Sequence, residues 1–143
     1  MDANSTLNGN YLTHSGEVAF SEITAPVICL YFSAHWCPPC RNFTPVLAKL
    51  YNEWNKDKKQ IEIIFVSSDN DLKSFKEYFE TMPWISLPFQ DSKTDTLCDL
   101  CDVQGIPMLV VISKEGKVLN ADARGLVTKY GEKAIDHLKT FYN

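Results

Sequence analysis

The sequence has little basic charge and no long hydrophobic run. Its 143 residues carry 14 lysines and arginines against 18 aspartates and glutamates, which gives a formal net charge of -4. No apolar stretch approaches the roughly 18 residues that a membrane-spanning helix needs. The acidic balance gives no basic footprint for a nucleic acid. We therefore expect a protein that acts on neither membranes nor nucleic acids.

The chain also lacks repeats, linkers and low-complexity segments. Residues 1–20 have neither the basic start nor the apolar centre of a secretory signal peptide, so we expect a cytoplasmic location. The length and the 45% hydrophobic content suit one domain over residues 1–143 with its own core. Residues 1–10 are polar and aperiodic, and we expect them to be loosely ordered. No feature indicates an oligomer, and we expect a monomer.

Cysteine is present in an odd number, five residues, and two of them belong to a Cys-Pro-Pro-Cys motif. Residues 27–32 form an apolar, β-branched and aromatic run typical of a buried strand. A helical pattern begins just after Cys37 and extends to Trp54. Cys37 therefore lies where a strand passes into the N-terminus of a helix.

This position favours a reactive sulfur at Cys37. Unpaired backbone N–H groups and the positive end of the helix dipole stabilise an anion such as a thiolate. Cysteine pKa values fall from about 8.5 to about 3.5–7.5 in such settings. Cys40, one helical turn later, is placed to attack a mixed disulfide at Cys37. Pro38 suits the first helical turn, and Pro39 stiffens the loop and removes a second N–H donor.

The remaining pattern alternates strands and helices. A crossover helix between residues 27–32 and residues 61–66 makes these two strands parallel, so that both end at the same edge of the sheet. Asp69 should therefore lie near Cys37. Residues 84–91 indicate an irregular loop. The expected strands are 11–12, 17–20, 27–32, 61–66, 108–113 and 117–119, and the expected helices are 38–54, 72–79, 94–102 and 134–142.

Several motifs in this order resemble the tryparedoxin and nucleoredoxin branch of the thioredoxin superfamily. The resemblance extends from about Gly16 to Leu138. It implies an α/β protein with a thioredoxin fold, in which a central mixed sheet carries helices on both faces and a short N-terminal β-hairpin. The motifs are Tyr31-Phe32-Ser33-Ala34, Trp36-Cys37-Pro38-Pro39-Cys40-Arg41, Phe43-Thr44-Pro45, Met82-Pro83-Trp84, Leu87-Pro88-Phe89 and Gly105-Ile106-Pro107.

The resemblance also implies a set of supporting residues. It makes the Ile106–Pro107 peptide bond cis, with Pro107 facing the thiols and the backbone of Ile106 free to pair with an extended substrate. Many thioredoxins have a buried aspartate where this chain has Tyr31. Proton transfer to and from Cys40 therefore needs another route, for which Asp69 is the candidate. Arg124 matches a family arginine near the thiol site.

The residues immediately before Cys37 have two interpretations each. Trp36 can form a lip against which partners dock, because it is an aromatic side chain directly before a solvent-facing thiol. His35 can assist thiolate formation by its charge, or it can be a solvated side chain. For Asp69 and Arg124 the alternative is likewise a solvated surface charge.

A second Cys-x-x-Cys motif consists of Cys98 and Cys101. Residues 41–97 separate it from Cys40, far more than the about 15–20 residues of common zinc modules. We expect Cys101 to fill core and Cys98 to be more exposed, although a regulatory disulfide or second redox pair stays open. Cys29 lies in the buried strand and should be inert.

The predicted function is the reduction of protein disulfides by a Cys37–Cys40 dithiol, with no cofactor beyond that redox-active disulfide and no metal. The expected partners are disulfide-containing proteins such as peroxiredoxin-type enzymes. The electron donor is trypanothione, glutathione or a reductase. Two alternatives remain: a redox-sensing module that regulates a partner without turnover, and a zinc-binding module.

Overall fold

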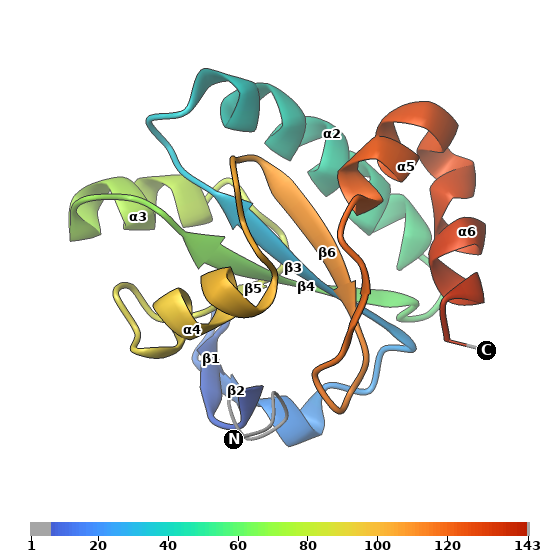
Figure 1. Cartoon of the computed structure of the whole chain (residues 1–143), viewed down its shortest axis with the longest axis horizontal. Helices are drawn as coiled ribbons and strands as arrows, with labels where there is room; N and C mark the ends of the chain where they lie inside the picture. Colours follow the sequence, from blue (N-terminus) through green and yellow to red (C-terminus); the bar gives the residue numbers. More distant parts are fainter. Residues whose placement is uncertain (1–6, 143) are drawn as a thin grey trace.

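The computed structural model describes residues 7–142, which form a seven-stranded mixed sheet covered by helices on both faces (Figure 1). The strand order is β2-β1-β5-β4-β3-β6-β7. β3 and β4 pair in parallel, and β6 runs antiparallel to β3. The strands are β1 Asn10–Leu12, β2 Glu17–Ala19, β3 Val27–Ser33, β4 Ile61–Ser67, β5 Ile85–Ser86, β6 Met108–Ile112 and β7 Val118–Asn120.

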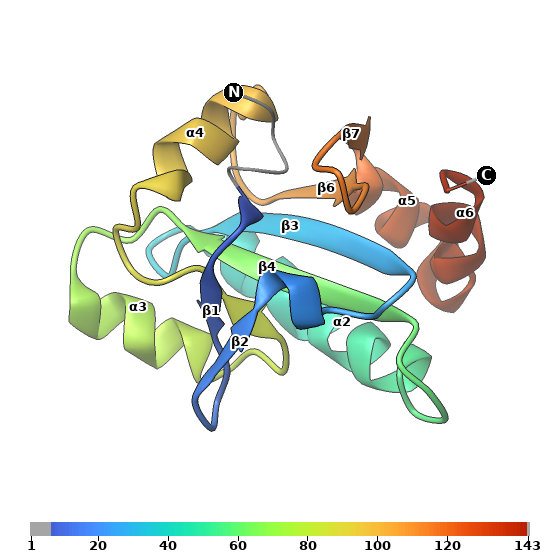
Figure 2. The ribbon, with the colours of Figure 1, turned by 90° about the horizontal axis from the view of Figure 1, so that it is seen from below.

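The helices divide between the two faces of the sheet (Figure 2). The α-helices α2, α3, α5 and α6 pack on one face, and α4 and η1 cover the other with the N-terminal segment. The predicted thioredoxin fold with helices on both faces is therefore confirmed. The helices are η1 Phe20–Glu22, α2 Pro38–Trp54, α3 Leu72–Phe79, α4 Lys93–Leu100, α5 Ala123–Tyr130, η2 Gly131–Lys133 and α6 Ala134–Thr140.

β3 is buried on both faces, which explains its continuous apolar sequence. Successive side chains of a strand point to opposite faces. Cys29 and Tyr31 accordingly face the α2 side, whereas Leu30 and Phe32 face the α4 side. The sheet thus carries two cores, and its central strand contributes to each.

Residues 1–10 were expected to be loosely ordered, and the structure differs from this expectation for the residues that it describes. Residues 1–6 lie outside the described part of the chain. Leu7 is fully buried, and its carbonyl accepts a hydrogen bond of 2.6 Å from the Tyr11 hydroxyl. Asn10 already begins β1, which pairs with β2 as the predicted hairpin at the sheet edge. Residues 7–10 are therefore part of the packed fold.

The sequence pattern did not predict β5, α5 or the 3-10 helices η1 and η2, and η1 begins at Phe20, which was expected to end the strand 17–20. β5 lies within residues 84–91, predicted as an irregular loop, and pairs with both β4 and β1. α5 precedes the predicted last helix, and its N-cap Asp122 accepts a hydrogen bond from Gly125 N. Among residues 7–142, no helix is both long and apolar enough to cross a membrane.

Candidate active site

Cys37 is the N-cap residue of α2 and directly follows the turn that leaves β3. Pro38 and Pro39 occupy the first two helical positions and have no N–H to donate. The next N–H, that of Cys40, donates to Cys37 Sγ over 3.4 Å. The two prolines thus leave one backbone donor, and it points at the Cys37 sulfur.

The two cysteines of the motif differ in access. Cys37 is 5% exposed, with Pro38 and Pro39 exposed beside it, whereas Cys40 is 0% exposed. Burial raises the pKa of the Cys40 thiol to about 11. A partner can therefore reach Cys37 from solvent, while Cys40 lies behind it as a neutral thiol.

The Ile106–Pro107 peptide bond is cis, as the resemblance implied, and it lies beside the thiols. Cys37 Sγ is 3.9 Å from the Ile106 carbonyl oxygen, and Ile106 packs against the cluster of Ala34, Cys37 and Cys40. Arg124 Nη1 donates to the Pro107 carbonyl over 3.0 Å. The structure therefore brings Arg124 to this loop, at the N-terminus of α5.

Trp36 and the end of β4 form another side of the site. The Trp36 side chain is 55% exposed, and its Nε1–H donates to the Ser68 carbonyl over 3.0 Å. An exposed ring held by one hydrogen bond fits the predicted lip better than a core residue. Its neighbour His35 stacks on the Tyr78 ring, with centroids 5.3 Å apart.

Asp69 lies at the predicted sheet edge, but its contacts differ from those of a proton acceptor for Cys40. One carboxylate oxygen accepts from the His35 backbone N–H over 2.7 Å, and the other accepts from the Ser67 hydroxyl over 2.7 Å. Within residues 7–142, Asp69 makes no hydrogen bond to Cys37 or Cys40. These bonds fix the loop that carries Trp36 and Cys37.

A cluster of buried hydroxyls beside Cys40 was missed in the sequence. The Tyr78 hydroxyl hydrogen-bonds to Ser33 Oγ and to Thr44 Oγ1, each over 2.6 Å. Tyr31 Oη bonds to Thr44 over 2.7 Å. Ser33 could have been noticed as a polar residue ending a buried apolar strand. The helical spacing from Phe75 would have placed Tyr78 on the inner face of α3, where it is buried. Leu72, which was predicted for that face, is exposed.

The other cysteines lie as expected. Cys29 and Cys101 are buried, and Cys98 is half-buried. Burial raises the pKa of all three thiols, that of Cys101 to about 12. Within the described residues, no three His, Cys, Asp or Glu side chains converge as a metal site would require.

The chain is similar to known thioredoxin-like proteins over most of its length. The family described as thioredoxin-like matches residues 26–118. The tryparedoxin of Trypanosoma brucei brucei is 41% identical over 117 residues, covering 80% of this chain and 81% of the relative. A solved tryparedoxin II, complexed with glutathionylspermidine, superposes with a TM-score of 0.79 at 35% identity over 87% of this chain and 88% of that one.

The plant nucleoredoxins that the chain matches are much longer than the chain. Probable nucleoredoxin 1 of Arabidopsis thaliana is 43% identical over 118 residues, which is 82% of this chain but 20% of the relative. The chain spans between a fifth and a third of the length of the plant nucleoredoxins that it matches. The family match and the tryparedoxin similarity agree with the motifs and the fold. The chain belongs to the thioredoxin-like family of oxidoreductases, within its tryparedoxin and nucleoredoxin branch.

Proposed function

We propose that this protein is a thiol–disulfide oxidoreductase that reduces protein disulfides through Cys37 and Cys40. The observation that carries the proposal is the unequal placement of the two thiols. Cys37 caps α2 at the surface with a backbone N–H directed at its sulfur, and Cys40 is fully buried one turn behind it. One sulfur can meet a partner, and the other can only meet the first.

The first step is attack by the Cys37 thiolate on a substrate disulfide. A new S–S bond forms between Cys37 and one substrate sulfur, and the other substrate sulfur leaves as a thiolate. The Cys40 N–H and the helix N-terminus stabilise the negative sulfur before attack. The Ile106 carbonyl, 3.9 Å from Cys37 Sγ, can accept a backbone hydrogen bond from an extended substrate.

The second step resolves the mixed disulfide. Cys40 loses its proton and attacks Cys37 Sγ, so that the Cys37–Cys40 disulfide forms and the second substrate sulfur leaves as a thiolate. Two electrons have then passed from the dithiol to the substrate. A thiol or a reductase must return them before the next cycle.

The partners follow from this cycle. The exposed Trp36 ring and the Ile106–Pro107 loop flank Cys37 and suit an extended protein segment that carries a disulfide, such as that of a peroxiredoxin-type enzyme. The solved tryparedoxin II is complexed with glutathionylspermidine, a glutathione-derived thiol. We therefore propose a small thiol or dithiol as the electron donor, with a reductase as the alternative.

Turnover tests the proposal. Catalytic amounts of the protein should accelerate the reduction of insulin disulfides by dithiothreitol, with many insulin molecules reduced per protein molecule. The oxidised protein should then be offered trypanothione, glutathione, or thioredoxin reductase with NADPH, and one of these should reduce it rapidly. A protein that reacts once with a disulfide and is not recycled by any donor would be a redox sensor, and the proposal would fail.

A further inference from the structure

The buried hydroxyl cluster lies beside Cys40. Ser33, the last residue of β3, lies near enough to the Cys40 thiol for its side chain to lower the pKa of that thiol. Ser33 Oγ is 2.6 Å from the Tyr78 hydroxyl, which is 2.6 Å from Thr44 Oγ1. Ser33 is 0% and Tyr78 3% exposed. Three elements, β3, α2 and α3, therefore place uncharged hydroxyls in a row behind the thiol.

The path ends at an opening on the surface. Tyr78 and Thr44 line a pocket of about 340 Å³ between α2 and α3, together with His35, Arg41, Pro45 and Thr81. Cys40 is not among the lining residues, whereas Thr44 and Tyr78 are. The hydroxyl row thus connects a thiol without solvent access to a site that solvent can reach.

The resolving step creates a need for such a path. Burial, the largest effect, raises the pKa of Cys40 to about 11, and the nearby Ser33 side chain opposes that rise. A neutral Cys40 must therefore lose its proton during attack on the mixed disulfide, at a moment when substrate covers Cys37. Asp69, the sequence-based candidate for this role, holds His35 N and Ser67 Oγ instead.

We propose that Ser33 and Tyr78 relay the Cys40 proton to the pocket between α2 and α3 as Cys40 attacks the mixed disulfide. This inference rests on the thiol–disulfide exchange proposed above. The proton of Cys40 moves to Ser33 Oγ, the hydroxyl proton of Ser33 moves to Tyr78 Oη, and the hydroxyl proton of Tyr78 moves to water in the pocket. The relay moves one proton and no electrons, and each hydroxyl remains neutral.

The surroundings suit transfer between neutral groups. Burial also raises the pKa of Tyr78 and of Tyr31, so both keep their protons and can donate and accept. Cys37, Tyr31 and Tyr78 are the titratable groups that influence Cys40. The Tyr31 hydroxyl hydrogen-bonds to Thr44 and not to the proposed relay residues Ser33 and Tyr78, so Tyr31→Phe provides a matched control.

Two-phase reaction with Ellman's reagent separates the two steps of the exchange. Attack by Cys37 releases the first thionitrobenzoate, and attack by Cys40 on the mixed disulfide releases the second. A Cys98→Ala background removes the other accessible thiol. The rate of the second release, followed by stopped flow in H2O and D2O between about pH 6 and 9, reports the resolving step with its proton transfer.

Tyr78→Phe, which keeps the ring, should slow the second release at least about tenfold and leave the first unchanged. Ser33→Ala should do the same, and Tyr31→Phe should leave both releases unchanged. The second release should be slower in D2O for the parent protein. In Tyr78→Phe it should rise more steeply with pH, because hydroxide must then remove the proton.

Two results would overturn the relay. In one, Tyr78→Phe and Ser33→Ala resolve the mixed disulfide at the parent rate. In the other, Tyr31→Phe slows the second release as much as Tyr78→Phe does, which would show a general effect of losing any hydroxyl in the cluster. Loss of the first release in the parent protein would instead refute the proposed exchange itself, so the two failures are distinguishable.

Discussion

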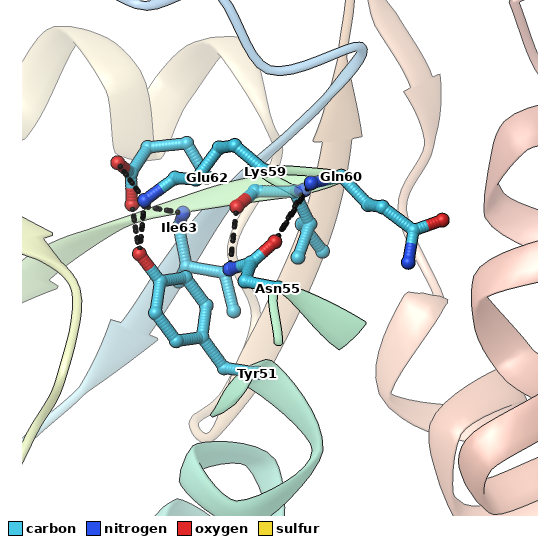
Figure 3. A network of polar contacts seen from close by, with 7 residues as sticks. Tyr51, Asn55, Lys59, Gln60, Glu62 and Ile63 are labelled. Carbon is cyan, nitrogen blue, oxygen red and sulfur yellow. Dashed lines mark hydrogen bonds and ion pairs between the residues drawn. The ribbon is translucent and has the colours of Figure 1, made fainter. Parts of the chain in front are cut away.

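The two ends of the sheet each bury a tyrosine-centred polar cluster, and the clusters are built differently. At the carboxyl ends of β3 and β4, Ser33, Thr44 and Tyr78 join hydroxyls that carry no charge. At the amino-terminal end of β4, Tyr51 and Lys59 surround the buried carboxylate of Glu62 (Figure 3). The first cluster is uncharged, lies beside the Cys40 thiol and lines a pocket, whereas the second is charged.

The Glu62 cluster is closed on itself. One carboxylate oxygen accepts from Tyr51 Oη over 2.9 Å and from Ile63 N over 3.0 Å, and the other lies 3.0 Å from Lys59 Nζ. Asn55 accepts from the Gln60 and Ile61 backbone N–H groups nearby, which ties the end of α2 to the start of β4. Both oxygens of the Glu62 carboxylate therefore have partners within the cluster.

Similar residues have different roles at the two ends of the sheet. A buried carboxylate whose bonds are complete stabilises the junction of α2 and β4. A row of neutral hydroxyls, each able to donate and accept, can pass a proton. We therefore expect substitutions at the thiol end to change exchange rates and substitutions at the Glu62 end to change stability.

The largest expected effect is on activity at the thiol end. Cys37→Ser should reduce disulfide exchange to the uncatalysed background, because serine is not a thiolate nucleophile at neutral pH. Cys98→Ser is the matched control and should retain full turnover in the insulin assay. Equal losses in both variants would place the reactive thiol elsewhere.

At the opposite end, Glu62→Ala should lower the free energy of unfolding by about 2–3 kcal/mol, because Tyr51 Oη and Ile63 N–H lose their acceptor. The half-exposed Lys59 can turn to solvent, which limits the loss. Glu62→Gln keeps an acceptor and should cost less. Urea unfolding measures the free energy of unfolding of both variants. Their rate of disulfide exchange in the folded state should match that of the parent protein. A lower exchange rate would contradict the assignment of stability to the Glu62 cluster and of exchange to the thiol end.

Alkaline pH should destabilise the folded protein in part through Cys40. The pKa of Cys40 is raised by burial from 9.0 to about 11, so the folded state keeps a proton that the unfolded chain has lost. The stability from this group is complete below about pH 9 and is lost as the pH rises to about 11. Cys40→Ala should therefore show a shallower fall in unfolding free energy over this range. Parallel curves for parent and variant would contradict the raised pKa.

The smallest effect is expected at the lip of the site. Trp36→Phe removes an N–H that donates to Ser68 O at an exposed position, so the free energy of unfolding should fall by about 1 kcal/mol or less. The remaining ring should keep substrate contact, with KM raised modestly and kcat preserved. Steady-state insulin reduction separates the two constants. A large fall in kcat would give Trp36 a part in the reacting geometry.

The sequence predicted those features that depend on nearby residues. The apolar run of β3, the helix that begins after Cys37 and the hairpin at the N-terminal edge follow from local patterns. The cis Ile106–Pro107 bond came from the family resemblance and not from its residues alone. The parallel arrangement of β3 and β4 also placed Asp69 correctly next to the site, but it did not predict the hydrogen bonds that Asp69 makes.

The features that were missed depend on residues far apart in the chain. β5 is two residues long and exists through its pairing with β1 and β4. The hydroxyl cluster joins Ser33, Thr44 and Tyr78 from three elements, and no one element shows it. α5 is different, because the Asp122 N-cap was a readable local signal.

The most direct test of the account is to trap the mixed disulfide. Cys40→Ala protein, reduced and then mixed with an excess of oxidised insulin, should stop after the first step. Peptide mapping by mass spectrometry should then find insulin attached to Cys37, and a reductant should release it. Attachment to Cys98 or Cys101, or full reduction of insulin without a trapped adduct, would contradict the assignment of Cys37 as nucleophile and Cys40 as resolving thiol.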